Sequence, residues 1–235
     1  MTCQELRESV CRANLELVRR GLVIGTWGNA SGIDRAAGVV AIKPSGVGYA
    51  ELTPEKIVLL DLDGKVLEGT LRPSSDTPTH LALYRAWNEL GGVVHTHSVY
   101  ATIFAQASRS IPCFGTTHAD HFHGTIPVTR SLTPEETAGE YEANTGKVIV
   151  EAFSGEEGRH PDPISMPATL VAHHGPFTWG RDAHDAVENS AVLEIVAQMA
   201  FGSIQIAPGL QPLHEFLLDK HYLRKHGSNS YYGQK

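Results

Sequence analysis

Hydrophobic residues recur at helical spacing along several parts of the chain. The longest run follows Asp182 and continues to about Ala200, and another begins after a capping box at Thr2–Glu5 and ends at Gly21. Further helices are predicted from Pro78 to about Gly91, over 99–107, from Thr133, and over 213–226. Short apolar runs bounded by turn residues predict strands over 39–42, 57–62, 65–67, 92–98, 147–153 and 169–173.

The pair Asp63-Gly64 separates two of these predicted strands and suits a tight hairpin turn. A hairpin makes its strands antiparallel, so the sheet cannot be purely parallel. Helices and strands alternate along a chain of 235 residues, of which 41% are hydrophobic. We therefore expect one α/β domain spanning residues 1–235.

Composition excludes several classes of protein. The formal net charge is −7 and the sequence contains no basic stripe, which argues against nucleic acid as a partner. Apolar runs stay below the roughly 18 residues needed to span a bilayer, and the first residues do not resemble a signal peptide. The cysteines are Cys3, Cys11 and Cys113, an odd number without CxxC spacing, so we expect neither a disulfide framework nor a thiolate zinc site. A cytoplasmic protein without membrane partners is expected.

Two histidines, His95 and His97, follow the apolar run that begins at Gly92. In a strand they share one face, with Cα atoms about 7 Å apart, so both rings can turn onto one metal ion. Taken alone, the pair is equally compatible with an exposed strand end. A second apolar strand ends at His173-His174, and three imidazoles with a carboxylate are typical of a catalytic metal site.

Small polar residues form three further candidate segments. The segment 25–32 is either a loop with exposed backbone N–H groups or an ordinary turn. Lys43-Pro44-Ser45-Gly46 combines a cation with hydroxyl and backbone donors, which suits a phosphate. Ser74, Ser75 and Asp76 precede a helix, whose N-terminus favours an anion; Asp76 is equally compatible with a capping role and with a metal-facing role.

These motifs, together with a histidine-rich segment at 115–124, resemble those of the L-ribulose-5-phosphate 4-epimerases in the class II aldolase/epimerase superfamily. The matching segments are Thr26-Trp27-Gly28-Asn29, Lys43-Pro44-Ser45-Gly46, Pro73-Ser74-Ser75-Asp76-Thr77-Pro78-Thr79-His80, His95-Thr96-His97, Gly115-Thr116-Thr117-His118-Ala119-Asp120, His174-Gly175-Pro176-Phe177, 218–227 and Tyr231-Tyr232-Gly233-Gln234. The resemblance covers essentially the whole chain. It implies a three-layer α/β/α domain with a central mixed, largely antiparallel sheet flanked by helices.

The resemblance implies one divalent metal ion per subunit, with zinc the first choice and manganese the alternative. The implied ligands are Asp76, His95, His97 and His174. His174 is preferred to His173 because the family's metal-binding histidine directly precedes the glycine.

The implied substrate is a phosphorylated ketopentose. Its expected contacts are Gly28, Asn29, Lys43, Ser45, Gly46, Ser74 and Ser75. Asp120 and Tyr232 match an acid/base pair that reaches the metal site from a neighbouring subunit of a homotetramer, so the tail 213–235 would complete an inter-subunit active site. Thr116 and His221 match supporting positions. The chain departs from the family at His121 and His123, where aromatic residues are usual, and in a slightly longer loop at 154–167.

The implied reaction inverts carbon 4 of L-ribulose 5-phosphate and gives D-xylulose 5-phosphate, as in pentose catabolism such as that of arabinose. The carbon 4 proton is not adjacent to the carbonyl, so cleavage between carbons 3 and 4, which leaves an enediolate, is the feasible route. One alternative is a class II sugar-phosphate aldolase of the fuculose-phosphate type, which would carry glutamate near position 76. The other is a catalytically silent adducin-like domain, which would not need the four metal ligands.

Overall fold

The computed structural model describes residues 1–154 and 160–232. Within these residues the strands form one seven-stranded sheet in the order β4-β3-β2-β1-β5-β7-β6, and neighbouring strands pair antiparallel. The strands are β1 (Asn29–Asp34), β2 (Val39–Ile42), β3 (Val58–Asp61), β4 (Val66–Glu68), β5 (Gly92–His95), β6 (Ala168–Leu170) and β7 (Pro176–Gly180). An isolated parallel bridge joins Val128 to Leu170. The predicted largely antiparallel sheet is confirmed.

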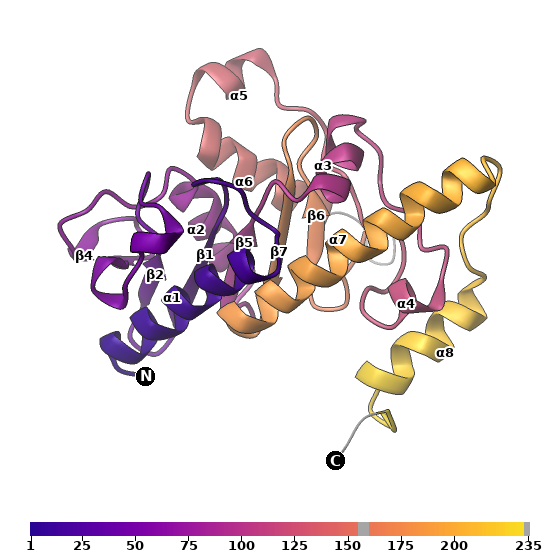
Figure 1. Cartoon of the computed structure of the whole chain (residues 1–235), viewed down its shortest axis with the longest axis horizontal. Coiled ribbons are helices and arrows are strands. Elements are labelled where there is room, and N and C mark those ends of the chain that lie inside the picture. Colours follow the sequence, from indigo (N-terminus) through magenta and orange to yellow (C-terminus); the bar gives the residue numbers. More distant parts are fainter. Residues whose placement is uncertain (155–159, 233–235) are drawn as a thin grey trace.

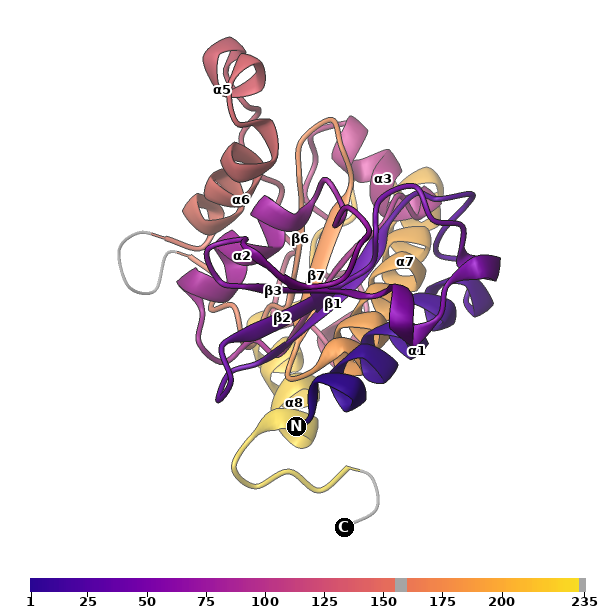
Figure 2. The same cartoon turned by 90° about the vertical axis from the view of Figure 1, so that its left-hand side faces the viewer.

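Helices cover both faces of this sheet, as Figure 2 shows. One face carries α1 (Cys3–Arg19) and α7 (Ala183–Ile206), and the other carries α2 (Thr77–Ala86) and α6 (Tyr141–Ala152). The remaining helices are α3 (Val99–Gln106), α4 (Thr116–Ala119), α5 (Pro134–Ala138), α8 (Glu215–His226) and the 3₁₀ turns η1 (Tyr49–Glu51) and η2 (Pro54–Lys56). The three-layer α/β/α prediction is therefore confirmed. In the described part of the chain, the helices are too short or too polar to cross a membrane.

Strand β5 divides the core because successive side chains of a strand point to opposite faces. Val94 packs in the cluster formed with α1 and α7, which includes Leu17 and Val187. Val93 packs in the opposite cluster, with Tyr84 of α2. The N-terminal capping box predicted at Thr2 is present, and the Asp182 side chain accepts a hydrogen bond from the Asp185 amide at the start of α7.

Several local predictions were wrong. Residues 147–153 belong almost entirely to α6 rather than to a strand, since Val148 and Ile149 are buried on the face of a helix that packs against α2. Residues 176–180 form the buried strand β7, which is absent from the strands predicted above, with Pro176 at its first position, where the missing N–H is tolerated. The segment 25–32 is a loop only to Gly28, because β1 begins at Asn29. The segment 115–124 contains the short helix α4, and part of the predicted loop 154–167 lies outside the described residues.

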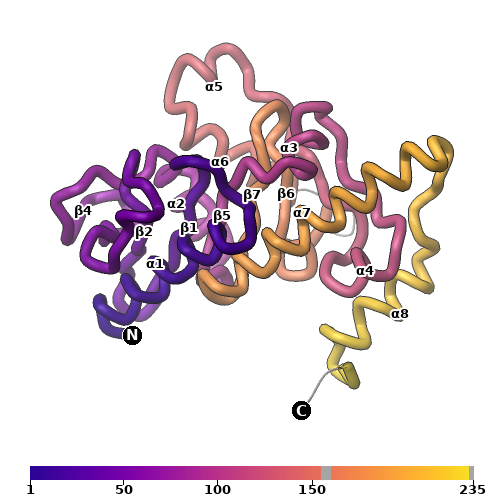
Figure 3. Tube along the Cα trace, viewed as in Figure 1, coloured from indigo at the N-terminus to yellow at the C-terminus, as the bar shows by residue number. Residues whose placement is uncertain are grey.

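The three central strands bring the candidate residues to one end of the sheet. Asn29 of β1 lies opposite His95 of β5, and His95 lies opposite Phe177 of β7. His174 lies in the turn between β6 and β7. Segments that are far apart in the sequence therefore meet beside the end of β5. The chain traced in Figure 3 also shows that α8 lies at the opposite side of the molecule from the start of α1.

Candidate metal centre and active site

Three histidine rings converge at the end of β5. The Nε2 atoms of His95 and His97 lie 3.1 Å apart, and one nitrogen from each of His95, His97 and His174 lies within 4.8 Å of the others. The strand ends at His95, yet His97 still turns its ring to the same side. The predicted convergence of these three rings is present in the folded chain.

The orientation of the His95 ring follows from its backbone contact. Its Nδ1 lies 3.0 Å from the carbonyl oxygen of Pro176, which can only accept, so Nδ1 carries the proton. The lone pair of Nε2 then faces His97. A histidine that donates from one nitrogen to a carbonyl is held ready to bind a metal with the other.

Two glycines allow the neighbouring segments to approach this cluster. A Cβ atom on Gly175 would lie 2.8 Å from the carbonyl oxygen of Thr96 and 3.5 Å from Cε1 of His95. Gly28 has a φ of +83°, and a Cβ there would lie 2.8 Å from the carbonyl oxygen of His95. The glycines therefore determine how closely the turn before β7 and the loop before β1 pack against His95.

Asp76 occupies the N-cap position of α2, but within the described residues its side chain makes no capping hydrogen bond. Instead its Oδ2 accepts a hydrogen bond of 2.6 Å from Nδ2 of Asn29. Burial raises the pKa of Asp76, but nearby His95 and His80 and the Asn29 amide outweigh burial and leave the pKa below its ordinary value. The Asp76 side chain therefore does not act as a cap, and it lines the same pocket as the histidines. It lies outside the group of three whose ring nitrogens fall within 4.8 Å of one another.

The donor set suits a divalent transition metal. Burial, together with His95 and His97, lowers the pKa of His174 to about 4, so its imidazole is neutral and can act as a ligand near pH 7. Its Nδ1 is buried and lacks a hydrogen-bond partner among the described residues. Imidazoles beside a carboxylate are ligands that zinc and related ions accept. These residues therefore fit the divalent metal that the family resemblance implies.

The cluster lies in a pocket of about 440 Å³. The pocket is lined by Thr26, Trp27, Gly28, Asn29, Lys43, Pro44, Ser45, Gly46, Ser74, Ser75, Asp76, His95, His97, Tyr141, Glu142 and His174. Backbone hydrogen bonds from Ser45 to Arg72 and from Ser74 to Lys43 join its two serine-bearing loops. All the substrate contacts expected at 28–29, 43–46 and 74–75 are thereby brought beside the histidines.

Two side chains that line the pocket, those of Lys43 and Asn29, carry polar groups that can contact a ligand. Lys43 is buried, with its ammonium 4.8 Å from the centre of the Tyr49 ring, and burial lowers its pKa. The Tyr49 hydroxyl donates to the carbonyl oxygen of Gly28, which ties the two loops together. Oδ1 of Asn29 is buried and lacks a partner among the described residues, so it remains available to accept a hydrogen bond from a ligand.

Five residues of the pocket lining were not among the predicted site residues: Thr26, Trp27, Pro44, Tyr141 and Glu142. The first three lie in the motifs quoted above, whereas Tyr141 and Glu142 lie in none of them. The Tyr141 ring centre lies 6.2 Å from that of His174, and Thr79 donates a hydrogen bond of 2.6 Å to the Glu142 carbonyl. Both Tyr141 and Glu142 belong to the first turn of α6. If residues 141–152 had been predicted as a helix, Tyr141 and Glu142 would have been placed in its first turn, next to α2.

The four other predicted residues lie outside the described pocket lining. Asp120 follows α4, and its carboxylate binds His221 and Arg224 of α8. Tyr232 packs its ring against Arg224, and Thr116 starts α4. Figures 1 and 2 show α8 at the lower end of the molecule, whereas α3, which begins two residues after His97, lies towards the upper end. One chain therefore holds two separate clusters.

The unusual histidines surround the second cluster. Nε2 of His121 lies 3.5 Å from Nζ of Lys225, and burial lowers the pKa of His121. Nε2 of His123 lies 2.7 Å from a carboxylate oxygen of Asp219. His173 is exposed with a φ of +63°, and it directs its ring to Ser108 instead of the metal cluster.

Comparison with known proteins shows the family to which the chain belongs. The protein-family model described as the class II aldolase and adducin N-terminal domain matches residues 8–201 of this chain. The chain belongs to this family. It is 56% identical to L-ribulose-5-phosphate 4-epimerase UlaF of Salmonella typhi and of Salmonella paratyphi A, over 99% of this chain and 100% of theirs. The expected resemblance to the 4-epimerases is therefore confirmed.

Solved structures share the same fold. An L-fuculose 1-phosphate aldolase is 25% identical, with a TM-score of 0.77 over 92% of this chain and 94% of the aldolase. YgbL of Klebsiella pneumoniae, described as a putative aldolase/epimerase/decarboxylase, is 26% identical, with a TM-score of 0.72 over 94% of this chain and 99% of YgbL. The likeness extends across almost all of each molecule.

Proposed function

We propose that the chain catalyses the metal-dependent epimerisation of L-ribulose 5-phosphate at carbon 4, giving D-xylulose 5-phosphate. The observation that carries this proposal is the pocket in which three histidines and Asp76 meet the loops of Ser45 and Ser74. The names of the full-length relatives supply the substrate. The reaction is expected in the cytoplasm.

The metal ligands in this proposal are Asp76, His95, His97 and His174. Zinc is the expected ion, with manganese as the alternative, at one per subunit. When bound, the ion supplies Lewis-acid stabilisation of the oxygens of the three-carbon fragment. The carbonyl of Pro176 keeps His95 in the tautomer that offers Nε2, and Asn29 holds the Asp76 carboxylate.

We assign the phosphate to the loops that line the same pocket beside the proposed metal ligands. Its expected contacts are Gly28, Asn29, Lys43, Ser45, Gly46, Ser74 and Ser75. Hydroxyl and backbone donors with one lysine cation are a typical phosphate environment. The phosphate belongs to the two-carbon fragment. These contacts therefore keep glycolaldehyde phosphate bound in the pocket after the bond between carbons 3 and 4 breaks.

A base removes the proton of the carbon 4 hydroxyl, and the electron pair of the breaking bond remains on carbon 3. The aldehyde of glycolaldehyde phosphate then rotates, carbon 3 attacks its other face, and an acid protonates the new alkoxide. We assign these two roles to Asp120 and Tyr232 of a neighbouring subunit in a homotetramer. We assign supporting roles to His221, which binds the Asp120 carboxylate at 3.0 Å, and to Thr116, whose carbonyl oxygen accepts a hydrogen bond from the Asp120 amide.

The test combines metal analysis with an assay on purified protein. L-ribulose 5-phosphate should yield D-xylulose 5-phosphate, detected with a coupled enzyme, and chelation should abolish turnover. Asp120→Asn should keep its metal and lose most of its turnover. Steady release of dihydroxyacetone would instead indicate an aldolase, the activity of one structural relative. Loss of metal in Asp120→Asn would contradict the separation of roles.

A further inference from the structure

One guanidinium group contacts both members of the proposed acid/base pair. Nε and Nη2 of Arg224 donate to the two carboxylate oxygens of Asp120, at 3.0 Å and 2.6 Å. The same guanidinium lies 4.8 Å from the centre of the Tyr232 ring. The carbonyl oxygen of Arg224 also accepts hydrogen bonds from the amides of Tyr231 and Tyr232. Arg224 thus joins α4, α8 and the tail that follows α8.

The geometry of this contact is specific to arginine. Two parallel N–H···O bonds fix the plane of a carboxylate, whereas an ammonium acts as a point charge and fixes neither plane nor rotation. The Asp120 side chain is 13% exposed and that of Arg224 is 23% exposed, so the pair is partly shielded from water. A carboxylate that acts as a general base must be held within hydrogen-bond distance of the proton that it removes, and a fixed orientation provides this.

We propose that Arg224 is the positioning residue that holds Asp120 and Tyr232 as one preassembled acid/base unit for the metal site of a neighbouring subunit. This inference rests on the proposed function, and it adds a residue that neither the metal site nor the phosphate grip contains. Arg224 acts through Asp120 and Tyr232 and does not itself exchange the substrate proton.

The charges around Asp120 predict a pH signature. Burial raises the pKa of Asp120, but Arg224, His221 and Lys225 of α8 outweigh burial and keep the pKa below its ordinary value. His121 is the next residue after Asp120 in the sequence, and the charge of Glu188, on α7, raises the pKa of His121. Tyr232 is the neighbouring group of the tail. Removal of Arg224 leaves His221 and Lys225 in place, so the Asp120 pKa should rise but Asp120 should still ionise.

The experiment compares Arg224→Met, Arg224→Lys and the control Lys220→Met in the full-length enzyme. Lys220 lies on the same helix and stacks on Tyr231, 5.3 Å from its ring centre, and does not contact Asp120 in the described structure. Arg224→Met should lower kcat on the order of 10–100-fold with a far smaller change in KM, because it removes positioning and not substrate binding. The acidic limb of its kcat/KM profile should move to higher pH, and Arg224→Lys should recover part of kcat.

A second measurement does not depend on turnover. Amide hydrogen exchange across 116–122 should accelerate in Arg224→Met and stay as in the wild type in Lys220→Met. An unchanged kcat, pH profile and exchange in Arg224→Met would overturn the proposal. The proposal would also be overturned if kcat fell in both Arg224 variants only in proportion to their loss of bound metal or of assembled oligomer. Absence of epimerase activity in the wild type would refute the proposed function instead, while the exchange result would still test the holding role of Arg224.

Discussion

At the scale of single residues, Gly175 determines whether the histidines can meet. It directly follows His174, and its missing side chain leaves room for the Thr96 carbonyl oxygen, which would lie 2.8 Å from a Cβ at this position. The metal cluster therefore depends on a residue that offers no ligand atom. The same close approach holds the Pro176 carbonyl against Nδ1 of His95.

Gly175→Ala should destabilise the protein and lower its metal content. The added Cβ would lie 2.8 Å from a backbone oxygen, so either the turn or the end of β5 must shift. Overpacking of this kind costs about 1–3 kcal/mol in the free energy of unfolding. Chemical denaturation and metal stoichiometry measure the two effects. Gly48→Ala is the control, because a Cβ at Gly48 meets nothing within 4 Å among the described residues; equal metal content in the two variants would contradict the prediction.

The buried side chain of His118 predicts a pH-dependent stability. Burial lowers its pKa to about 4, although its Nε2 donates to the carbonyl oxygen of Gly124. Between the unfolded pKa near 6.5 and the folded value, the unfolded chain binds the extra proton, so stability falls as pH falls. The loss approaches on the order of 3 kcal/mol at about pH 4.

His118→Gln should therefore flatten the dependence of unfolding free energy on pH between about 6.5 and 4. Denaturant titrations at several pH values, on the variant and on the wild type, give the difference. His184→Gln, at a side chain of α7 that is 72% exposed, should retain the wild-type slope. Parallel pH curves for His118→Gln and the wild type would show that His118 is not the group responsible.

Much of the candidate site could be predicted from residue types. Imidazoles, a carboxylate and Ser-Gly loops carry their chemistry in the sequence, so His95, His97 and the Ser45 loop, which line one pocket, could be proposed from the sequence alone. The tautomer of His95 could not be predicted, because it depends on a carbonyl 81 positions away. Nor could the choice between capping and ligand roles for Asp76, since both roles require the same residue in the same place.

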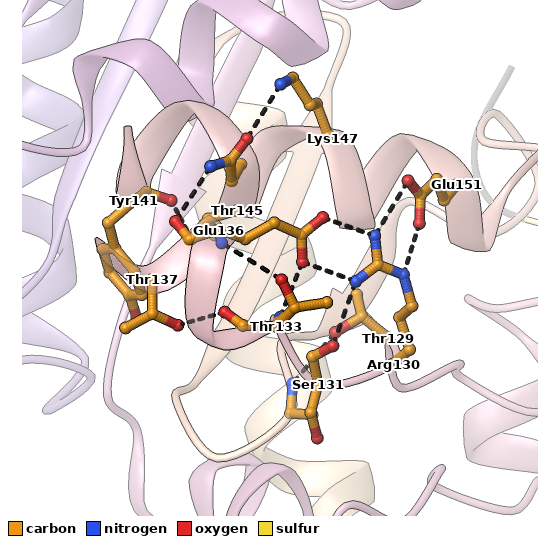
Figure 4. Close-up of polar contacts among 12 residues, drawn as sticks. Thr129, Arg130, Ser131, Thr133, Glu136, Thr137, Tyr141, Thr145, Lys147 and Glu151 are labelled. Atoms are coloured by element: carbon orange, nitrogen blue, oxygen red, sulfur yellow. Dashed lines mark hydrogen bonds and ion pairs between the residues drawn. The ribbon is translucent and has the colours of Figure 1, made fainter. Parts of the chain in front are cut away.

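At the scale of elements, a polar network joins α5 to α6, whose first turn lines the pocket. Figure 4 shows Arg130 between Glu136 of α5 and Glu151 of α6. Its guanidinium donates to both carboxylates of these helices, at distances of 2.8 to 3.1 Å. Thr133 and Glu136 complete a capping box at the start of α5. The Arg130 side chain thus links α5 to α6 and fixes the position of the segment between them, which leads to Tyr141.

Arg130→Met should loosen α5 and α6 with little loss of global stability. The Arg130 side chain is 44% exposed, and exposed ion pairs contribute about 1 kcal/mol or less. Amide hydrogen exchange should accelerate over 134–152 and stay unchanged in α7, and KM should rise because Tyr141 and Glu142 line the pocket. Arg181→Met, which removes an exposed pair with Asp185, is the matched control. Wild-type exchange over 134–152 in Arg130→Met would rule out the anchoring role.

The errors in predicting elements have a common physical cause. Helix α6 contains Val148, Ile149 and Val150 in succession, and a short apolar run of β-branched residues fits a buried strand and a buried helix equally well. Strand β7 begins with Pro176 and ends with Gly180, residues that usually mark turns. In both places tertiary packing decides: α2 covers α6, and β5 and β6 pair with β7. The two longest helices, α1 and α7, were both predicted, but α7 continues to Ile206, beyond its expected end near Ala200.

At the scale of the whole molecule, the chain separates two sets of chemical groups. The histidines lie at the end of β5, whereas Asp120, His221 and Arg224 join α4 to α8. Figure 1 shows α4 and α8 side by side at the lower right of the molecule, below the right-hand part of α7. The described pocket contains the proposed metal ligands but not the proposed acid and base. If both sets act on one substrate, each active site must combine residues of two chains.

Mixed oligomers test this arrangement directly. His97→Asn removes a proposed metal ligand and Asp120→Asn removes the proposed acid/base group, so each variant alone should have little activity. In a cyclic assembly formed by equal co-expression, about a quarter of the sites would pair an intact metal site with an intact Asp120, and activity should recover to that extent. A mixture of His97→Asn with His174→Asn is the control, because both defects lie in the same cluster and no combination of chains repairs it. Recovery in neither mixture would mean that each active site is built from one chain alone. Recovery in the control would mean that His97 and His174 do not serve the same metal site.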